Sequence, residues 1–491
     1  MLQIKNLRSM FELQDFFQDS DQAVKTIVDV YRQFRVCKTV QKLNNYKQKG
    51  FIATDVLMVL QLMSFSLSKS VYGMLKSGMS YMTEMEKDVY YRLKNNPNID
   101  WRLLLFSFAK RFRKISQEQS CDKNKSVRCL IIDDVFLRKT GKAIEKIGKV
   151  YDHVLQKYLL GFKMLTLGFW DGKSFLPLDF SFHSEKGKNK EKPYGLSRKE
   201  LKARYRKKRD KLAAGYKRMQ EVSKKKSEMA KTMLKRAVKH GFIPDYVLMD
   251  KWFISEDMIR VIRKLKKGVV HLIAACKKDK RKYSYRGKQL TAKQILALNK
   301  SEIKHCRTLK MLYIPVIVEY KGIKMFLFFN KANRRKHWEL LVTTDLNLSF
   351  KKALETYSIR WTIEVFFKEC KQHLGLGKCQ SNDFDAQIAD TTITLMGYIL
   401  LNLMKRFSSY ETLGEAYSNT QIFMLELNLS GKIWNMFVQL CRSLCDWLGV
   451  DYNEVISVFF QTPQFQESIF RFLDPWEKVK TNKEVEFDNA A

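Results

Sequence analysis

Two short apolar segments, each ending in a carboxylate, constrain the fold of this chain more than any other feature of its sequence. Residues 127–134 read VRCLIIDD, and residues 245–250 read DYVLMD. Short apolar runs bounded by polar residues are typical of buried strands. In α/β proteins, residues at the ends of strands lie where ligands bind. We therefore expect a sheet that presents Asp250, together with Asp133 or Asp134, to a ligand.

Two further strand-like runs follow the first acidic segment, at residues 159–169 and 174–182. The tetrapeptide WDGK separates them. An Asp-Gly pair between apolar runs is a strong hairpin signal, because a tight turn needs residues that tolerate positive φ. The sequence thus predicts three strands in a meander, followed by a helix.

A third acidic residue, Glu364, lies in a segment with helical periodicity, YSIRWTIEVFFKECKQ at residues 357–372. The apolar residues that predict the buried face of one helix are Ile359, Ile363, Phe366 and Cys370. The polar residues that share an adjoining stripe, about 60° wide at about 100° per residue, are Tyr357, Arg360, Glu364 and Lys371. A carboxylate among such residues suits a divalent metal beside a phosphate backbone. The simpler alternative is a solvated Arg–Glu pair one helical turn apart.

Asp133 or Asp134, Asp250 and Glu364 together supply the oxygen ligands for metal-dependent phosphoryl transfer. Two divalent cations about 4 Å apart can activate the attacking oxygen and stabilise the leaving oxygen. Each Asp considered alone is more simply explained as a turn or helix-cap residue. Successive side chains of a strand point to opposite faces, so at most one of Asp133 and Asp134 should be a metal ligand.

The pattern Tyr-x2-Arg-x3-Glu-x6-Lys, followed by LGLGKCQS at residues 374–381, resembles the signature of bacterial insertion-sequence transposases of the DDE type. The group is called insertion-sequence family four, and the resemblance covers roughly residues 127–390. It implies an α/β fold with a ribonuclease H-like catalytic core, a β-rich insertion before the acidic helix, and flanking N-terminal and C-terminal helical regions. It also implies a DNA transposase that binds terminal inverted repeats and catalyses metal-dependent cleavage and strand transfer.

The resemblance assigns roles to individual residues. Asp133, Asp250 and Glu364 would be catalytic and would hold two Mg²⁺ or Mn²⁺ ions, with Asp134 as the alternative first ligand. Relatives typically have Asp-x-Thr at this position, which aligns Asp133, but Val135 stands where the Thr is expected.

The resemblance also implies how the protein contacts DNA. Tyr357, Arg360 and Lys371 would contact the DNA backbone at the cleaved end, within a homodimer that holds two double-stranded transposon ends and the target. Cleavage would proceed through a hairpin intermediate. Trp252 and Trp338 are candidates for stacking on a flipped base, although core packing is the simpler role for both. Two other functions remain open: a related metal-dependent nuclease that cuts without joining, and a catalytically inactive DNA-binding descendant.

The charge of the chain points to a polyanionic partner. It carries 90 Lys and Arg against 51 Asp and Glu, a formal charge of +39, as expected of a nucleic-acid-binding protein. The segment 186–239 is strongly basic and is predicted to lack strands. We expect a cluster within it to bind DNA, namely Arg204, Arg206, Lys207, Lys208 and Arg209. The alternative is a solvated linker.

Composition and periodicity suggest the following domain organisation. Residues 1–120 should form a helical, DNA-binding region, and residues 127–380 the catalytic domain, with the β-rich insertion at about 265–345. A helical region at 381–476 and a frayed tail at 477–491 follow. The strands expected after the second acidic segment are residues 269–276, 281–287, 311–322, 323–329 and 340–344. The Tyr320-Lys321-Gly322 turn predicts a second hairpin, between the third and fourth of these strands.

Several features indicate where the protein works. The nine cysteines include no CxxC pair, which argues against a disulfide framework or a zinc site. The N-terminus lacks the apolar core of a secretion signal, and the apolar run at residues 393–404 is too short to span a bilayer and should form a buried helix. We therefore expect a cytoplasmic, nucleoid-associated bacterial protein.

Overall fold

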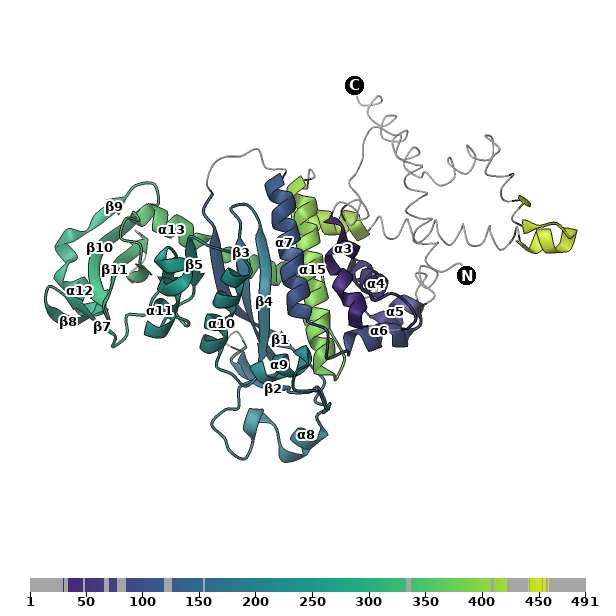
Figure 1. Ribbon diagram of the computed structural model, residues 1–491. Helices are drawn as coiled ribbons and strands as arrows, with labels where there is room; N and C mark the ends of the chain where they lie inside the picture. The colour runs from purple at the N-terminus through teal and green to yellow at the C-terminus, as the bar shows by residue number, and fades with distance from the viewer. Residues whose placement is uncertain are drawn as a thin grey trace, which may run out of the picture. The chain divides into compact units, whose positions relative to one another are not determined.

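The computed structural model describes most of residues 30–421 and parts of residues 440–458 (Figure 1). The described residues are 30, 34–46, 49–65, 70–76, 85–118, 126–152, 155–332, 337–407, 410–421, 440, 442–452, 454–455 and 458. The predicted tail at 477–491 lies outside them. The chain divides into two compact units, of which the larger contains residues 20–71 and 85–420. In the smaller unit, the described residues include most of α5 (Val71–Lys76) and a short helix at 442–448.

A mixed, twelve-stranded sheet runs through the larger unit. Its strand order is β2-β3-β1-β5-β6-β12-β11-β10-β7-β8, with β4 paired to β3 and β9 paired to β10. The strands are β1 (Cys129–Arg138), β2 (Gly148–Asp152), β3 (Lys157–Trp170), β4 (Phe175–His183), β5 (Tyr246–Met249), β6 (His271–Ala275), β7 (Lys282–Tyr285), β8 (Lys288–Thr291), β9 (Lys304–Cys306), β10 (Met311–Tyr320), β11 (Ile323–Ala332) and β12 (Glu339–Thr343).

The central strands have the order β4-β3-β1-β5-β6. The first three form the antiparallel meander that the sequence predicts, and β5 and β6 then run parallel to β1. This mixed α/β arrangement is consistent with a ribonuclease H-like fold. β6 therefore lies in the central sheet, although it falls within the range expected for an insertion. The strands β7 to β11 come between β6 and its antiparallel neighbour β12.

The hairpin between β3 and β4 confirms the Asp-Gly signal. Gly172 has a φ of +106°, which favours glycine, and a Cβ there would lie 2.0 Å from the Ser126 hydroxyl oxygen. The Asp171 carboxylate accepts hydrogen bonds from the backbone N–H groups of Lys173 and Ser174, at 2.9 and 2.8 Å. Side chain and backbone thus fix the turn together.

The second predicted hairpin is also present. Tyr320 pairs with Ile323 across a two-residue turn in which Lys321 and Gly322 have φ values of +52° and +81°. Two successive positive φ angles are the geometry of a type I′ turn, which suits the twist of the flanking strands. All five strands expected after the second acidic segment appear in the structure as β6, β7, β10, β11 and β12.

Helices cover the sheet, and further helices lie beside it (Figure 1). The helices are α3 (Val36–Val40), α4 (Ala53–Phe65), α6 (Lys87–Lys94), α7 (Trp101–Glu118), α8 (Arg198–Ala203), α9 (Ala214–Glu221), α10 (Lys226–Lys239), α11 (Glu256–Lys264), α12 (Ala292–Leu298), α13 (Phe350–Ser358), α14 (Trp361–Gln372) and α15 (Phe384–Phe407), with 3₁₀ turns η1 (Gln41–Tyr46), η3 (Pro193–Gly195), η4 (Leu265–Gly268) and η5 (Lys300–Glu302).

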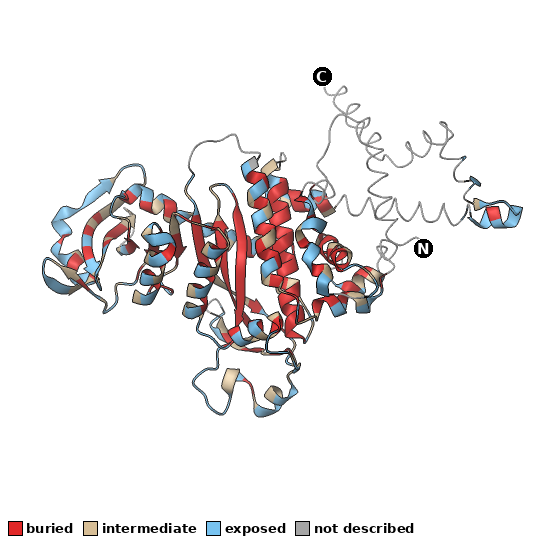
Figure 2. Ribbon diagram, in the orientation of Figure 1, coloured by how far each residue is buried: buried red, intermediate tan, exposed pale blue. Residues whose placement is uncertain are grey.

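The helix α15 is the most buried helix of the larger unit. It packs against α7 and β4 and also contacts α4 and α6, and Figure 2 shows it buried along most of its length. The buried helix expected at residues 393–404 is therefore confirmed. Among the described residues, no helix is both long enough and apolar enough to cross a membrane.

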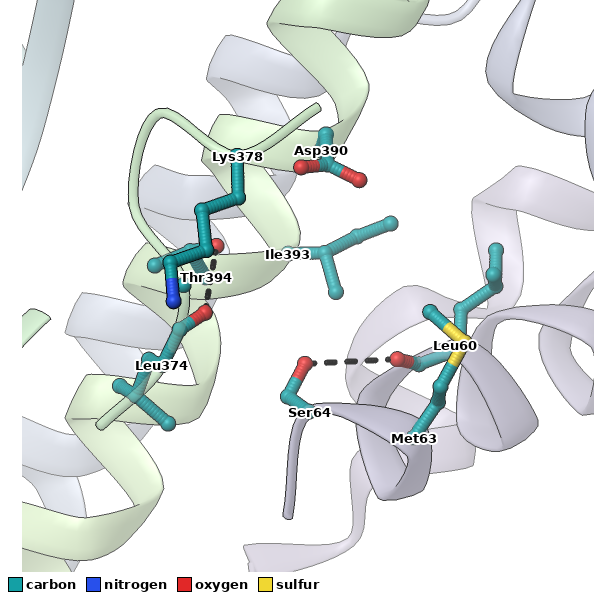
Figure 3. A pocket seen from close by; sticks show the side chains of 9 residues that line it. Leu60, Met63, Ser64, Leu374, Lys378, Asp390, Ile393 and Thr394 are labelled. Carbon is teal, nitrogen blue, oxygen red and sulfur yellow. Dashed lines mark hydrogen bonds between the residues drawn. The ribbon is translucent and has the colours of Figure 1, made fainter. Parts of the chain in front are cut away.

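A small cavity of about 30 Å³ lies where α4 approaches α15 (Figure 3). It is bordered by Leu60 and Ser64 of α4 and by Ile393 and Thr394 of α15. Two of its hydroxyl groups already donate to backbone carbonyls, Ser64 to Leu60 and Thr394 to Leu374, at 3.4 and 3.5 Å. This volume has room for about one or two water molecules, so the cavity is a packing feature.

Candidate active site

The two predicted acidic strands lie side by side at the centre of the sheet. β1 and β5 are parallel, and their last paired residues are Ile132 and Met249. Asp133 and Asp250, the next residue of each strand, therefore leave the shared ladder at the same level. β1 itself continues to Arg138 along β3, so Asp133 lies within β1 and not at its end. The prediction that Asp133 ends its strand was therefore wrong. The structure adds that the two carboxylates come from neighbouring strands.

Asp133 and Asp134 have different partners. Asp133 accepts a hydrogen bond from the Arg360 guanidinium at 2.9 Å, and Asp134 pairs with the Lys226 ammonium of α10 at 2.7 Å. Alternating side chains of a strand point to opposite faces, which explains the separation. Only Asp133 is joined through Arg360 to Glu364 of α14.

Arg360 connects two of the three predicted catalytic carboxylates. Its Nη1 lies 2.9 Å from Asp133 Oδ2, and its Nη2 lies 2.5 Å from Glu364 Oε1. Burial opposes the charged guanidinium, but the neighbouring Tyr357, Glu364 and Asp133 raise the pKa of Arg360 above its ordinary value. The Arg–Glu pair expected one helical turn apart is thus present, and it also holds Asp133.

The helix expected at residues 357–372 is two helices, α13 and α14. The N–H groups of Ile359, Arg360, Thr362 and Ile363 all bond to the carbonyl three residues earlier, as in a 3₁₀ turn. The backbone at Ile359 and Arg360 keeps helical φ and ψ. The prediction of one continuous helix was therefore wrong at this point, and Tyr357 belongs to α13.

Tyr357 lies beside Arg360 and is affected by the charge of Asp250. The Arg360 guanidinium carbon is 5.9 Å from the centre of the Tyr357 ring. Burial raises the pKa of the Tyr357 hydroxyl, the Arg360 charge lowers it, and the charge of Asp250 raises it. Asp250 thus acts electrostatically on Tyr357, the neighbour of Arg360.

The environment of Asp133 disfavours its negative charge. The pKa of Asp133 is raised to about 6, mainly by burial. The Asp134 N–H group and the Arg360 charge oppose this rise, and the nearby carboxylates Asp134 and Glu364 add to it. A buried carboxylate with this balance gains from additional positive charge. Cation binding would supply that charge.

The buried face of α14 agrees with the predicted pattern. Ile363, Phe366 and Cys370 have no exposed surface, while Ile359 at the helix break is half-buried. The Phe366 ring lies 5.1 Å from that of Phe175 in β4. This packing fixes α14 against the central sheet and so positions Glu364.

Lys371 and the loop after α14 contact the distal half of β1. Lys371 Nζ donates to the carbonyl of Phe136 at 3.1 Å, and burial lowers the pKa of this lysine. Gly375 and Gly377 have φ values of +72° and +87°. The buried Lys139 donates to the carbonyls of Gly377 and Cys379, at 2.7 and 3.0 Å. The glycines of the LGLG segment thus permit a turn that joins α14 to the end of β1.

Trp252 is exposed close to the acidic residues. Its side chain follows Asp250 by two residues and is 69% exposed, so the simpler prediction of core packing was wrong. The ammonium groups of Lys226 and Lys277 lie 5.7 and 5.6 Å from its ring centre. Lys226 was not singled out in the sequence, because its pairing with Asp134 depends on the tertiary fold.

Trp338 is also not a core residue. It is half-buried, and the Lys331 ammonium lies 5.5 Å from its ring centre.

The predicted DNA-binding cluster at residues 204–209 divides into two groups. The Arg209 side chain has no exposed surface and pairs with Glu145, Asp383 and Asp385, at 2.6, 3.3 and 2.9 Å. Lys207 pairs with the same two Asp residues, at 2.8 and 3.0 Å. Their predicted role in DNA binding is corrected, because these charges are already matched by carboxylates within the fold.

The other members of this cluster lie nearer the surface. Arg204 donates to the Ile147 carbonyl at 2.9 Å and lies over the Tyr194 ring, and it is half-buried. Arg206 and Lys208 are exposed, and they are the residues of the cluster that remain available to DNA.

The chemistry of the predicted ligands fits a hard divalent cation, since all three supply carboxylate oxygens. In the described part of the chain, no three His, Cys, Asp or Glu side chains converge closely enough to form a metal cluster. The Arg360 guanidinium lies between Asp133 and Glu364 and supplies positive charge there. The three predicted ligands are therefore of the chemical type that a divalent cation binds, namely Asp133, Asp250 and Glu364. An arginine, Arg360, lies between two of them.

Comparison with known families agrees with this arrangement. Residues 43–289, half of the 491-residue chain, match the family model described as DDE superfamily endonuclease. The chain belongs to the DDE endonuclease superfamily. Residues 220–400 of this DDE protein also match the model of a transposase DDE domain, so the two matched ranges include all three predicted catalytic residues. No curated protein matches the chain.

The matches support a transposase-like, DNA-cleaving function for this DDE protein. They confirm the DDE class that the sequence resembles. Assignment to insertion-sequence family four, which depends on the residues from Tyr357 to Lys371, stays a prediction.

Proposed function

We propose that this DDE protein is a DNA transposase of the insertion-sequence type, of the group with the Tyr-Arg-Glu-Lys pattern. It binds the terminal inverted repeats of its element, cleaves the DNA at their ends and joins the freed 3′ ends to target DNA. The observation that carries the proposal is the junction of β1, β5 and α14. Asp133 and Asp250 leave adjacent strands at the same level, and Glu364 is linked to Asp133 through Arg360.

Asp133, Asp250 and Glu364 would hold two Mg²⁺ or Mn²⁺ ions. Such ions, when bound, increase the reactivity of the attacking oxygen and stabilise the leaving oxygen. The partners of the first two acidic residues favour Asp133 over Asp134 as the ligand, because Asp134 is paired with Lys226.

Arg360 has two successive roles in this proposal. In the metal-free protein it compensates the charges of Asp133 and Glu364. When the carboxylates hold cations, the guanidinium loses these partners and can make a bidentate contact with a DNA phosphate. Tyr357 and Lys371 would position the same DNA strand, as the resemblance implies.

Trp252 adds a surface for stacking on DNA bases. An exposed aromatic ring with ammonium groups near it suits single-stranded or unpaired DNA, because bases stack on the ring and lysines pair with phosphates. The proximity of Lys226 and Lys277 to this ring supports such a role. Arg206 and Lys208, in the segment before α9, would contact the DNA backbone at another point.

The domain assignments belong to the same proposal. The strands β7 to β11 correspond to the β-rich insertion, residues 1–120 to a helical DNA-binding region, and residues 381–476 to a C-terminal helical region. We infer a homodimer that holds two transposon ends and target DNA in the cytoplasm, associated with the nucleoid.

A cleavage assay tests the proposal. The full chain would be incubated with Mg²⁺ and a supercoiled plasmid that carries the DNA flanking its own gene, including any short inverted repeats. We expect nicking and then double-strand cleavage at the repeat ends, both abolished by chelation of the metal. Failure to nick this plasmid under any divalent metal would contradict the proposal and favour an inactive DNA-binding descendant.

A second assay separates a transposase from an endonuclease that only cuts, which the superfamily description equally fits. Pre-cleaved end duplexes with free 3′-hydroxyl groups would be mixed with the protein, metal and target plasmid. Covalent joining of the ends to the plasmid identifies strand transfer. Cleavage without joining would assign the protein to the endonucleases that do not transpose.

A further inference from the structure

A basic lobe, residues 185–202, lies between β4 and α9 and includes η3 and α8. Figure 1 shows α8 beyond the sheet, beside β2. The loop before η3 carries four lysines, and α8 carries three further basic residues. All seven side chains are exposed. The basic lobe therefore presents a dense group of positive charges to solvent.

The acidic residues of the basic lobe offset only part of this charge. It contains three glutamates, of which Glu200 accepts a hydrogen bond from the Ser197 N–H at 2.9 Å and pairs with Lys142, outside the lobe, at 3.2 Å. Within the basic lobe, Glu185 and Glu191 remain to balance the seven basic side chains. An excess of exposed positive charge attracts a polyanion.

The loop of the basic lobe is held by its own hydrogen bonds. The Asn189 side-chain oxygen accepts from the backbone N–H groups of Glu191 and Lys192, at 2.9 and 3.1 Å. The Tyr194 N–H donates to the Lys186 carbonyl at 2.8 Å and closes the loop. The lysines therefore project from a backbone with a defined conformation.

The basic lobe is also anchored to the edge of the sheet. A Cβ on Gly148 of β2 would lie 3.1 Å from the Tyr194 Cβ, an approach that favours glycine. Leu196 has no exposed surface, and Ser197 and Glu200 form a capping box at the start of α8. This part of the basic segment is therefore folded, and the alternative of a solvated linker does not describe it.

The edge strand β2 brings the basic lobe level with the end of β1. Arg138, the last residue of β1, and Gly148 both pair with Gly161 of β3. Five residues and two strand spacings therefore separate Asp133 from Gly148, a distance of about 20 Å at about 3.3 Å per residue and about 4.8 Å per strand. Along duplex DNA, this distance corresponds to about six base pairs at about 3.4 Å each.

Lys371 lies on the same side of Asp133 as the basic lobe. It donates to the carbonyl of Phe136, which lies between Asp133 and the end of β1. Burial lowers the pKa of Lys371, and the charge of Asp152, the last residue of β2, opposes this change. The predicted DNA contact at Lys371 is therefore within electrostatic reach of the strand that supports the basic lobe.

We propose that the basic lobe binds the phosphate backbone of the same duplex whose scissile phosphate enters the candidate active site, about six or more base pairs from that phosphate. The inference rests on the proposed function in taking duplex DNA as the ligand of that site. Contacts of lysine and arginine with phosphates position a duplex without reading its sequence. The basic lobe thus adds affinity and fixes the direction in which the duplex leaves the site.

Salt-dependent DNA binding tests the basic lobe. The full chain would be titrated in EDTA with a fluorescent duplex several helical turns long, at several salt concentrations. Loss of one phosphate contact reduces the slope of log K against log salt by about 0.9, so we expect a reduction of up to about 1.8 when Lys190→Gln and Lys202→Gln are combined. The control combines Lys293→Gln and Lys300→Gln, at two exposed lysines of α12 and η5, and should change the slope less.

Neutral DNA linkages test the position of the contact. A duplex that carries the DNA flanking the gene would end at a free 3′-hydroxyl, with methylphosphonates in place of the phosphates about six to eight base pairs from this end. We expect these linkages to weaken binding of wild type and to leave binding of the Lys190→Gln, Lys202→Gln variant unchanged. The same change in both proteins, or no change in either, would show that the basic lobe does not bind this duplex and would overturn the proposal.

The outcomes distinguish the basic lobe from the proposed function. Equal salt slopes for wild type and the lobe variant would overturn the inference, whatever the cleavage activity, and so would an equal reduction of the slope in the control. A reduced slope and a position-dependent loss of binding in a protein that never cleaves would uphold the basic lobe and contradict the transposase assignment. Both variants change exposed side chains, so their melting temperatures should match that of wild type.

Discussion

Arg360 agrees with both interpretations of its helix that the sequence leaves open: an Arg–Glu ion pair on the helix surface, and a polar site around Glu364. Its pairing with Glu364 at 2.5 Å is the expected helix-surface ion pair, and its second pairing, with Asp133 at 2.9 Å, places both carboxylates around one cation. The guanidinium thus offsets the repulsion that the two carboxylates would otherwise exert on each other.

Replacement of Glu364 by Gln tests its role as a metal ligand. The amide keeps the size of the side chain and one oxygen but removes the charge that a divalent cation requires. We expect cleavage to fall below detection while duplex DNA binding stays within about threefold of wild type, since the charge change is small beside +39. Cleavage near the wild-type rate would show that Glu364 holds no metal.

Paired substitutions distinguish Asp133 from Asp134. Asp133→Asn should eliminate cleavage because this carboxylate shares Arg360 with Glu364. Asp134→Asn removes the partner of Lys226 on the other face of β1 and should reduce cleavage far less. Both rates would be measured by plasmid nicking in Mg²⁺. Loss of cleavage in Asp134→Asn alone would reverse the assignment.

His183 links stability to pH. Burial lowers the pKa of this imidazole to about 4. The neutral ring donates from Nδ1 to the Lys224 carbonyl at 3.1 Å, and its Nε2 accepts from the Ser181 hydroxyl at 2.7 Å. Between about pH 6.5 and 4 the unfolded chain therefore binds more protons than the folded chain, so stability falls as pH falls through this window.

Replacement of His183 by Gln should remove this part of the pH dependence, which amounts to up to about 3 kcal/mol. Urea unfolding of wild type and His183→Gln at pH 7 and at pH 4.5 measures the difference. An identical loss of stability in both proteins would show that His183 is not the group responsible.

At the scale of elements, α14 has one face that stabilises the fold and another that serves the site. Ile363 has no exposed surface, so Ile363→Ala should cost about 2–5 kcal/mol of stability. Arg360→Ala should melt near wild type, because the Glu364 side chain is 34% exposed and water can solvate this carboxylate once the guanidinium is removed. It should nevertheless lose cleavage at transposon ends, since positioning of the scissile phosphate dominates such catalysis.

Thermal melting and plasmid cleavage, measured on the same samples, separate these two variants. If Arg360→Ala melts as early as Ile363→Ala, then Arg360 is a structural ion-pair residue and the functional face of α14 is assigned incorrectly.

The segment 204–209 offers a second matched comparison. Arg209→Ala leaves Glu145, Asp383 and Asp385 buried with only Lys207 to compensate them, and should cost about 3–5 kcal/mol. Lys208→Gln removes an exposed charge and should leave the melting temperature unchanged. In DNA titrations, Lys208→Gln should reduce the salt slope by about 0.9 if this lysine contacts a phosphate. Equal melting temperatures for the two variants would contradict the buried ion-pair network.

The elements that the sequence predicted well are those whose own residues carry strong local signals. The apolar runs of β1, β3, β4 and β5 and the Asp-Gly and Lys-Gly turns were sufficient to identify the meander and both hairpins. The strands β2, β8 and β9 were missed because each is three to five residues long and mostly polar. Such strands are stabilised by pairing with a neighbour, which no local pattern reports.

The acidic residues of the candidate site, and Arg360 and Lys371 near Glu364, could be singled out from the sequence, but Lys226 could not. Asp133, Asp250 and Glu364 stand out because they interrupt or flank apolar runs. Lys226 and Arg209 lie in a continuous basic segment. Nothing in the local sequence shows that Lys226 pairs with Asp134, or that Arg209 pairs with Glu145, while their basic neighbours face solvent. Only the tertiary fold, which brings residues more than 90 positions apart into contact, separates them.

At the scale of the whole molecule, the larger unit joins a central sheet to helices drawn from both ends of its sequence. α7 precedes β1, and α15 follows the acidic helix, yet the two pack together against β4. Residues beyond position 384 therefore complete the helical layer that covers β4.

The spacing of the three carboxylates along the chain bears on when the protein can act during its synthesis. Asp133, Asp250 and Glu364 are separated by 117 and 114 residues. A ribosome that adds about 5–20 residues per second needs about 12–46 seconds to pass from the first to the last. Throughout this interval the emerging polypeptide already carries basic segments that can associate with nearby DNA, but it lacks the third ligand. Under the proposed function, host DNA close to the site of translation would be protected from cleavage until α14 has left the ribosome and docked on β1.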